Sequence, residues 1–416
     1  MIFFKSKEIQ NTLFLLGDKG ITIILSSISF VIMGKYLGAT KFGLISYAIS
    51  FVAIFSPLAE WAYTTIVTKF IAQKYAVIDM IKKSLMLRLG GFLFVLVIIS
   101  ITTLFLEIGE DMITCIRILS FALLLDIVLI LRSYFDATLQ SRYFSYSQTT
   151  STIIGSGIRI ILALVYPSIV FICMSYFVEK LVKSLIILGF FISKSKDFKL
   201  GLEEISSKNI FLDSIPLILT NSFIIINFKI DQLIIEYFMG LQAVGQYAVV
   251  SKISEIWYLI PTTLFISYFP AIARSEREGK DSILAVKKVT RALLLISITI
   301  ALILTFTGET LIQFLFGEEY VNLGKVLSIH IWAGVFYFIG HPISKILIAK
   351  NLIWINFFGK MITIVVNIAL NFFFIPIFGL SGAAISTLVS YSIGYFFFYL
   401  IHPKVKLHIL FFRNKA

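Results

Sequence analysis

The stretch NTLFLLGDKGITIILSSISFVIM, residues 11–33, has the length and apolar character of a membrane-spanning helix. About 20 helical residues are needed to cross a hydrocarbon core roughly 30 Å thick. Two opposite charges, Asp18 and Lys19, interrupt this run near its middle. If the span began at Gly20, about 15 residues would precede Lys35, a length of roughly 22 Å that is too short without thinning the bilayer. The sequence therefore predicts a longer span that includes the charged pair.

Apolar windows of similar length recur along the whole chain. Of its 416 residues, 58% are hydrophobic and only 14% are charged, which is far from the composition of a soluble domain. We therefore expect an all-α polytopic membrane protein with twelve transmembrane helices. The twelve predicted spans lie near 11–33, 42–62, 84–106, 113–134, 148–166, 168–192, 211–235, 242–270, 289–315, 323–348, 353–375 and 379–401.

The net charge of +13 is explained by the position of the basic residues. If the N-terminus is cytoplasmic, basic residues such as Lys82, Arg142 and Lys194 fall inside, whereas the opposite loops carry acidic residues such as Glu110 and Glu318. This is the positive-inside pattern. It predicts that both termini are cytoplasmic, and it makes a nucleic-acid partner unnecessary to explain the charge.

The polar connections indicate two halves. The longest, about 193–210 and 271–288, are too short to hold a folded soluble domain, and the first lies at the midpoint of the chain. We therefore predict an N-terminal domain over residues 1–200 and a C-terminal domain over 201–416, each with six spans.

A weak internal repeat agrees with this division. The segment YLGATKFGLISYA follows the first span, and FMGLQAVGQYAVV follows the seventh. The matching positions are Gly38 with Gly240, Gly43 with Gly245, and Pro167 with Pro376. Because six spans return the chain to the same side of the membrane, this pattern predicts a parallel repeat about an axis along the membrane normal.

At these motifs the chain resembles the Wzx-type O-antigen and polysaccharide flippases of the multidrug/oligosaccharidyl-lipid/polysaccharide (MOP) transporter superfamily. The segments that carry the resemblance are YLGATKFGLISYAIS, FKIDQLIIEYFMGLQAVGQYAVVSKISEIW, YFPAIAR and NFFFIPIFGLSGAAIST. The resemblance implies two six-helix lobes around a central cavity, which alternate between inward-open and outward-open states in the bacterial inner membrane. It also implies that the cargo is an undecaprenyl-diphosphate-linked oligosaccharide, moved from the cytoplasmic to the periplasmic leaflet.

Several charged residues lie within the predicted spans. Such a charge costs about 2.5–3.5 kcal/mol at the centre of a helix, so most face a bundle interior or a water-filled cavity. The cationic candidates for binding the cargo are Lys19, Arg159, Lys252 and Lys360. The acidic candidates for coupling to an ion or for pairing with these cations are Asp18, Asp126, Asp231 and Glu255. Arg159 stands out because a guanidinium stays charged and can bind a diphosphate at two points.

Structural roles are the alternatives for these residues. Asp18 and Lys19 can neutralise each other, although adjacent helical positions face each other poorly. Lys252 and Glu255 have the i, i+3 spacing of an ion pair. Arg159 and Lys360 can extend toward the membrane surface, and Asp231 can be interfacial.

The remaining motifs favour a transporter without a bound cofactor or metal. The chain lacks a GxxxxGK[ST] loop for ATP, so we expect coupling to a proton or sodium gradient. An ion-coupled drug antiporter of the same superfamily is the alternative, and a membrane polysaccharide polymerase fits less well, because the chain lacks a long outer loop. We do not expect an enzyme. The expected partners are the lipid-linked oligosaccharide, membrane lipids and, by implication, a polysaccharide polymerase and a chain-length regulator.

Overall fold

The computed structural model describes residues 7–73, 75–194, 205–261, 283–349, 352–403 and 405. All the elements in these residues are helices, which confirms the predicted all-α class. The chain divides into two compact units, Met1–Ile225 and Ile226–Ala416, so the boundary lies within α8 (Ser207–Glu255). The predicted domain boundary between residues 200 and 201 lies outside the described residues.

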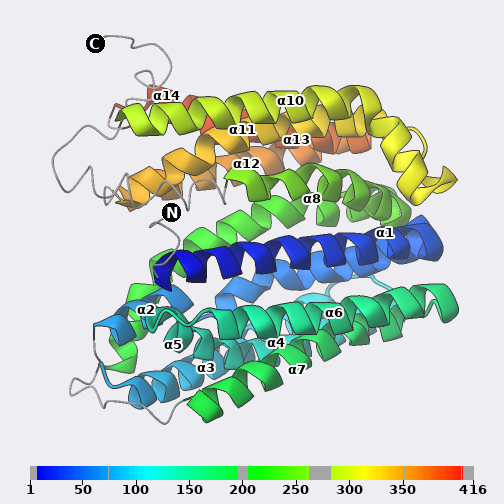
Figure 1. Cartoon of the computed structure of the whole chain (residues 1–416). Helices are drawn as coiled ribbons and strands as arrows, with labels where there is room; N and C mark the ends of the chain where they lie inside the picture. The colour runs from blue at the N-terminus through cyan, green and yellow to red at the C-terminus, as the bar shows by residue number, and fades with distance from the viewer. Residues whose placement is uncertain are drawn as a thin grey trace. The chain divides into compact units, whose positions relative to one another are not determined.

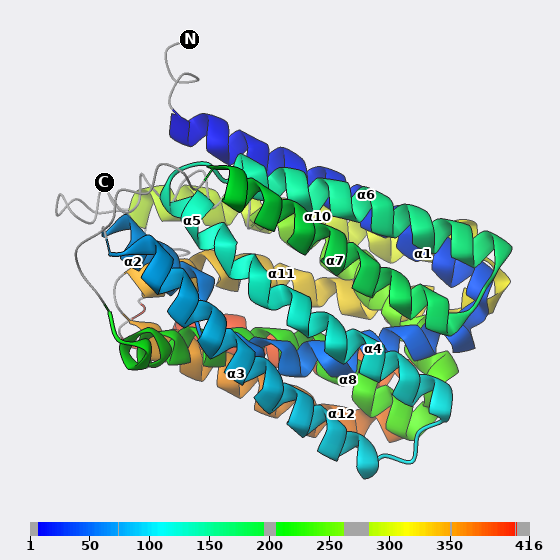
Figure 2. The same cartoon turned by 90° about the horizontal axis from the view of Figure 1, so that it is seen from below.

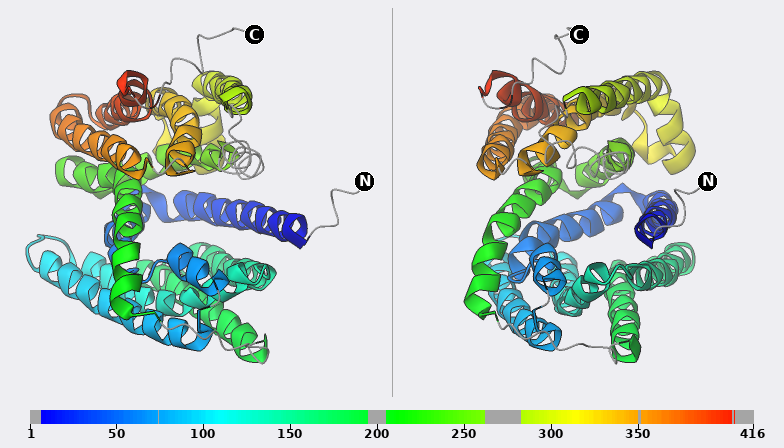
Figure 3. Two further views of the ribbon diagram at one scale, coloured as in Figure 1. Left: turned by 90° about the vertical axis from the view of Figure 1, so that its left-hand side faces the viewer. Right: turned by 60° about the vertical axis from the view of Figure 1, so that its left-hand side comes forward.

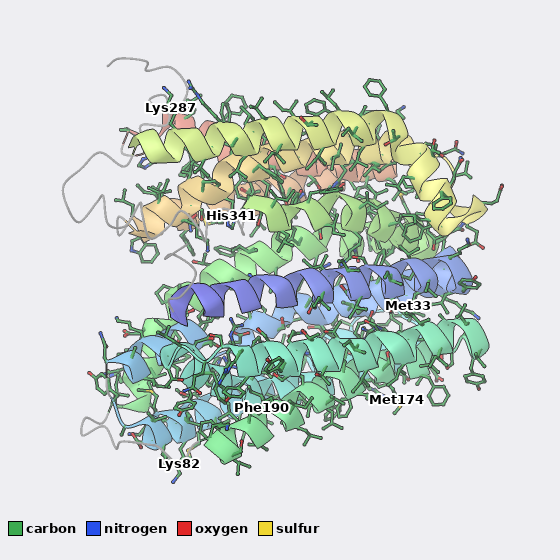
Figure 4. All side chains as sticks on the ribbon, viewed as in Figure 1. Met33, Lys82, Met174, Phe190, Lys287 and His341 are labelled. Carbon is green, nitrogen blue, oxygen red and sulfur yellow. The ribbon has the colours of Figure 1, made fainter. Side chains whose placement is uncertain are left out.

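The first unit is built on α1 and three helices that pack together. Its elements are α1 (Lys7–Phe55), η2 (Ser56–Ala59), α2 (Thr64–Ala72), α3 (Val77–Leu104), α4 (Glu110–Asp126), η3 (Ile127–Leu131), α5 (Arg132–Ala137), α6 (Arg142–Val165), α7 (Ile169–Lys194) and the beginning of α8 (Figure 1). α1 packs against α4 and α6, and α7 packs against the same two helices. Figure 2 shows α6 and α7 side by side. Near the start of α3, the exposed Lys82 points away from the ribbon (Figure 4).

The second unit is arranged around α11 and α13, which pack against each other. Its elements are the rest of α8, η5 (Ile256–Tyr258), α10 (Ile283–Phe316), η6 (Glu318–Tyr320), α11 (Gly324–Ala349), α12 (Ile353–Phe378), α13 (Leu380–Ser392), η7 (Ile393–Phe397) and α14 (Phe398–Ile401). α10 packs against α11, and α12 packs against α13. A π-helical turn, η7, continues α13 and also contacts α12.

Nine stretches in the described part of the chain are long and apolar enough to cross a membrane. Two of them, Lys19–Ala72 and Ser207–Pro261, are 54 and 55 residues long. As straight helices they would measure about 80 Å, more than twice the thickness of the hydrocarbon core. α7, with 26 residues, is also long enough to cross, although three charged residues lie near its middle.

Each of the two long runs turns at a single glycine. Gly38 has φ 77° and ψ 160°, and Gly240 has φ 78° and ψ −179°, a backbone region that is essentially restricted to glycine. In Figure 1, α1 runs to one end of the bundle and turns back, and Figure 3 shows the two legs of α8 running in different directions. The sequence predicts loops at these places, whereas helix continues up to a single non-helical residue. The shared conformation agrees with the predicted repeat.

We expect the Gly240→Ala variant to lose about 1–3 kcal/mol of the free energy of unfolding, because alanine is strained at this φ and ψ. A Cβ at Gly240 would meet no atom within 4 Å, so the loss would come from backbone strain alone. Thermal unfolding in detergent measures the effect. The control is Gly189→Ala on α7, where a Cβ also meets nothing within 4 Å and alanine favours the helix. Equal stability of the two variants would contradict this explanation of the turn.

Candidate functional site

A buried ion pair joins three helices of the first unit. Arg159 of α6 is only 3% exposed, and its Nη2 lies 2.7 Å from Oε2 of Glu179 on α7. Its Nε donates a hydrogen bond to Oγ of Ser29 on α1, over 3.3 Å, and Nη2 also lies 3.2 Å from Oγ of Ser156. The guanidinium therefore links α1, α6 and α7 at one point.

The surroundings of this pair hold both groups in place. The guanidinium of Arg159 lies over the ring of Tyr176, 4.2 Å from its centroid, which adds a cation–π contact. Thr152 donates a hydrogen bond of 3.1 Å to Oε1 of Glu179. A Cβ at Gly155 would lie 2.6 Å from Oε2 of Glu179, so glycine leaves the space that the carboxylate occupies. Nη1 of Arg159 has no hydrogen-bond partner among the described residues.

A second group of charged residues in the first unit, Asp126, Lys180 and Arg88, forms contacts near the ends of helices. Lys180, the next residue along α7, lies 2.6 Å from Oδ2 of Asp126 at the end of α4, with about a third of each side chain exposed. The buried Arg88 of α3 donates hydrogen bonds to the carbonyl oxygens of Asp126 and Ala62 and to Oγ1 of Thr64. Because these carbonyls lie at helix breaks, Arg88 satisfies acceptors that a continuous helix would satisfy itself.

The second unit contains a buried carboxylate surrounded by polar groups. Asp231 of α8 is 4% exposed. It accepts hydrogen bonds from Tyr247 (2.8 Å), from Thr387 of α13 (2.7 Å) and from Nδ2 of Asn371 on α12 (2.6 Å). Nδ2 of Asn371 also donates to Oδ1 of Asn367, over 3.0 Å. Within the described residues, no lysine, arginine or histidine forms an ion pair with Asp231.

The other predicted cations have different surroundings. Lys360 of α12 is 6% exposed, and its Nζ lies 3.8 Å from the centroid of the Tyr395 ring in η7. Lys252 and Glu255 lie one turn apart at the end of α8 and are partly exposed. His341 lies on α11 (Figure 4), and the centroid of its ring is 5.6 Å from that of the Tyr337 ring.

α1 begins at Lys7, so the first predicted span is helical through Asp18 and Lys19. Lys19 is partly buried there, whereas the side chain of Asp18 lies outside the described part of the structure.

The structure thus places three predicted residues, Asp126, Arg159 and Asp231, against partners outside the predicted set. The functions of all the predicted residues stay predictions. Asn367 and Asn371 were not predicted, although two asparagines at i, i+4 on an otherwise apolar helix signal a polar face. No signal in the sequence specified that Thr387 would contact Asp231.

These clusters can hold charge within a membrane. The first unit contains a carboxylate neutralised by a fixed guanidinium, and the second contains a carboxylate whose hydrogen-bond partners among the described residues are neutral groups. The described residues include no group of three or more histidine, cysteine, aspartate or glutamate side chains placed to hold a metal ion.

Curated relatives carry names from surface-glycan assembly. The chain is 25% identical over 199 residues to the capsular polysaccharide biosynthesis protein CapF of Staphylococcus aureus, covering 46% of this chain and 50% of that protein. It is 30% identical over 172 residues to the probable flippase AglR of Haloferax volcanii, covering 40% of this chain and 36% of that protein. The chain thus spans half or less of the length of these relatives.

Solved structures of membrane transporters share the fold. The lipid II flippase MurJ, in an inward closed conformation, matches with a TM-score of 0.73 at 18% identity, covering 93% of this chain and 86% of that chain. An inward-facing multidrug transporter of the MATE family and MOP superfamily matches with a TM-score of 0.70 at 14% identity, covering 93% and 95%.

The model of one protein family matches residues 9–276, and its description is polysaccharide biosynthesis protein. The predicted resemblance to polysaccharide flippases is confirmed by this match and by the flippase relatives. Since the match covers more than half of the sequence, the chain belongs to the polysaccharide biosynthesis protein family.

Proposed function

We propose that this protein is a flippase that moves an undecaprenyl-diphosphate-linked oligosaccharide, such as an O-antigen repeat unit, from the cytoplasmic to the periplasmic leaflet. The observation that carries the proposal is the family match over residues 9–276. The names of AglR and MurJ support it, because both are flippases by name. We do not propose an enzymatic step.

The proposed architecture has twelve spans in the bacterial inner membrane, with both termini cytoplasmic. Counting each run that turns at Gly38 or Gly240 as two spans, and adding α7, supports this number. Two six-helix lobes would then form a central cavity and transport by alternating access. The cavity would hold the sugars in water, and the prenyl chain would stay in lipid.

Cations in the spans would bind the diphosphate of the cargo. We propose Lys19, Lys252 and Lys360 for this role, because a lysine in a low-dielectric site gains strongly from binding phosphate oxygens. The burial of Lys360 against an aromatic ring, with no acidic group bonded to it in the described structure, supports its inclusion. Arg159 can offer only its Nη1 donors, because Glu179, Ser156 and Ser29 hold the rest.

Asp231 is the proposed ion-coupling residue. A buried carboxylate without a fixed counter-ion is costly unless it binds a proton or a cation. Asp231 fits this description, whereas Asp126 already pairs with Lys180. Asp18 and Glu255 remain further candidates. A proton or sodium ion would bind Asp231 in one conformation of the transport cycle and leave it in the other.

An ion-coupled drug antiporter is the second candidate, and the similarity to the MATE-family structure favours it. The basic excess among the predicted span charges argues against it, because a cationic drug requires an acidic cavity. A polysaccharide polymerase is a third and weaker candidate. As a flippase, the protein would work beside a separate polymerase and a chain-length regulator.

Deletion of the protein from its host tests the proposed function. We expect lipid-linked oligosaccharide to accumulate on the cytoplasmic face of the membrane and to disappear when the wild-type protein is restored. In the deletion strain, the Lys360→Ala variant should reach the membrane but should not restore transport. The control variant Lys82→Ala, at an exposed position, should reach the membrane and restore transport. The absence of accumulation in the deletion strain, with surface glycan unchanged, would overturn the flippase proposal.

A further inference from the structure

The two buried polar clusters are built from equivalent helices of the internal repeat. The cluster of the first unit uses α1, α6 and α7, and that of the second uses α8, α12 and α13. Ser29 lies nine residues before Gly38, and Asp231 lies nine residues before Gly240. Because these two glycines turn the chain with the same φ and ψ, Ser29 and Asp231 occupy matching positions.

The partners from the other helices match to within one residue. Arg159 lies eight residues before Pro167, and Asn367 lies nine residues before Pro376. Glu179 lies twelve residues after Pro167, and Thr387 lies eleven after Pro376. Pro167 lies between α6 and α7 whereas Pro376 lies inside α12, so these matches hold in the sequence and do not fix the rotation of the helices. Both units thus gather polar side chains where the first, fifth and sixth helices of the repeat meet.

The clusters differ in how their carboxylate is neutralised. In the first unit, the carboxylate of Glu179 comes from the last helix and lies 2.7 Å from the guanidinium of Arg159. In the second, the carboxylate of Asp231 comes from the first helix, and a neutral amide, that of Asn371, approaches it at 2.6 Å. The first site therefore carries its own cation, and the second does not.

We propose that Arg159 is a tethered cation, whose guanidinium takes in the first unit the place that an exchangeable monovalent cation takes in the second. Arginine cannot be deprotonated in a protein, so the charge of this cation does not depend on a gradient. The Arg159–Glu179 pair then stays electrically neutral throughout the transport cycle. Ion exchange is confined to Asp231. The proposal rests on the ion coupling proposed for Asp231.

The geometry fits a permanent occupant better than a group that leaves its site. Ser29 and Ser156 fix the guanidinium within hydrogen-bond distance, and the ring of Tyr176 covers one face. Glu179 in turn fills the space that Gly155 leaves open. Removing the guanidinium would leave a buried carboxylate beside a cavity of the same shape, which a free guanidinium ion can enter.

The test measures cation binding by thermal unfolding of the full chain in detergent, in the Asp231→Asn background that removes the second site. The probes are guanidinium, sodium and lithium chlorides at millimolar concentration, with choline chloride as the control salt. With Arg159 present, we expect no stabilisation beyond that by choline. With Arg159→Ala, guanidinium at ten times its half-saturating concentration should raise the melting temperature by about 2–4 °C. Adding Glu179→Gln should remove this rise.

A folded Arg159→Ala protein without a guanidinium response would overturn the proposal, and so would a response that persists after Glu179→Gln. If Arg159→Ala does not fold but Arg159→Gln/Glu179→Gln does, the unpaired carboxylate is the cause, and guanidinium chloride present throughout purification should restore folding of Arg159→Ala; failure to restore it would overturn the proposal. If neither variant folds, the residues serve packing and the proposal fails. The measurement needs no cargo, so its result is independent of the flippase assay. Persistence of the full gradient dependence in Asp231→Asn would overturn both the coupling at Asp231 and this proposal, but it would leave the flippase assignment standing.

Discussion

Replacing Glu179 by alanine is expected to lower the free energy of unfolding by about 3–5 kcal/mol, because it leaves the buried charge of Arg159 without its counter-ion. The 3% exposure of Arg159 and the 2.7 Å distance to Glu179 make this pair the most buried of the ion pairs described. Chemical or thermal unfolding in detergent gives the measurement. An exposed acid in a loop, replaced as Glu107→Ala, serves as the control and should change stability by less than about 0.5 kcal/mol.

A compensating double variant separates charge from packing. Arg159→Met/Glu179→Leu removes both charges and keeps much of the volume, so it should recover most of the loss caused by Glu179→Ala. A loss below about 1 kcal/mol for Glu179→Ala alone would contradict the view that burial makes this pair indispensable.

The second large effect is expected at Asp231. The Asp231→Asn variant should flip cargo at the same rate with and without an ion gradient, because an amide keeps the shape of the site but does not bind a proton or a cation as a carboxylate does. The hydrogen-bonded neighbours Tyr247, Thr387 and Asn371 should keep the fold intact.

The rate of cargo transfer in vesicles, measured with and without imposed proton and sodium gradients, checks this expectation. The control is Asp79→Asn, which removes an acidic partner of Lys83 in the first unit and should leave the gradient dependence unchanged. Persistence of the full gradient dependence in Asp231→Asn would assign the coupling to another residue.

Hydropathy predicted the helices because each span must bury its backbone hydrogen bonds within one apolar segment. The same reasoning predicted that α1 continues through Asp18 and Lys19, because a shorter helix would not cross the hydrocarbon core. The sequence repeat identified Gly38 and Gly240 as matching positions, but it predicted loops there and not turns at a single residue. Glycine at positive φ allows helix on both sides, with no polar loop to mark the reversal.

The partners within the clusters were beyond sequence reasoning. Arg159 and Glu179 lie on separate helices, and the rotation of each helix about its axis decides whether they meet. The charged residues near the middle of α7 indicate a polar region of that helix, but they do not indicate which neighbouring helix it faces. The neutral groups around Asp231 were missed for another reason: the i, i+4 spacing of Asn367 and Asn371 indicates a polar face, but asparagine and threonine carry no charge that demands a partner.

Reconstitution of the purified protein in liposomes tests the central claim most directly. Vesicles would contain a fluorescent undecaprenyl-diphosphate oligosaccharide, and a reagent that cannot cross the bilayer would report how much of it is exposed on the outer leaflet. We expect the wild-type protein to move this lipid between leaflets at least ten times faster than it moves in protein-free vesicles, and we expect Lys360→Ala not to do so. Equal rates with and without protein, from a sample shown to be folded, would contradict it.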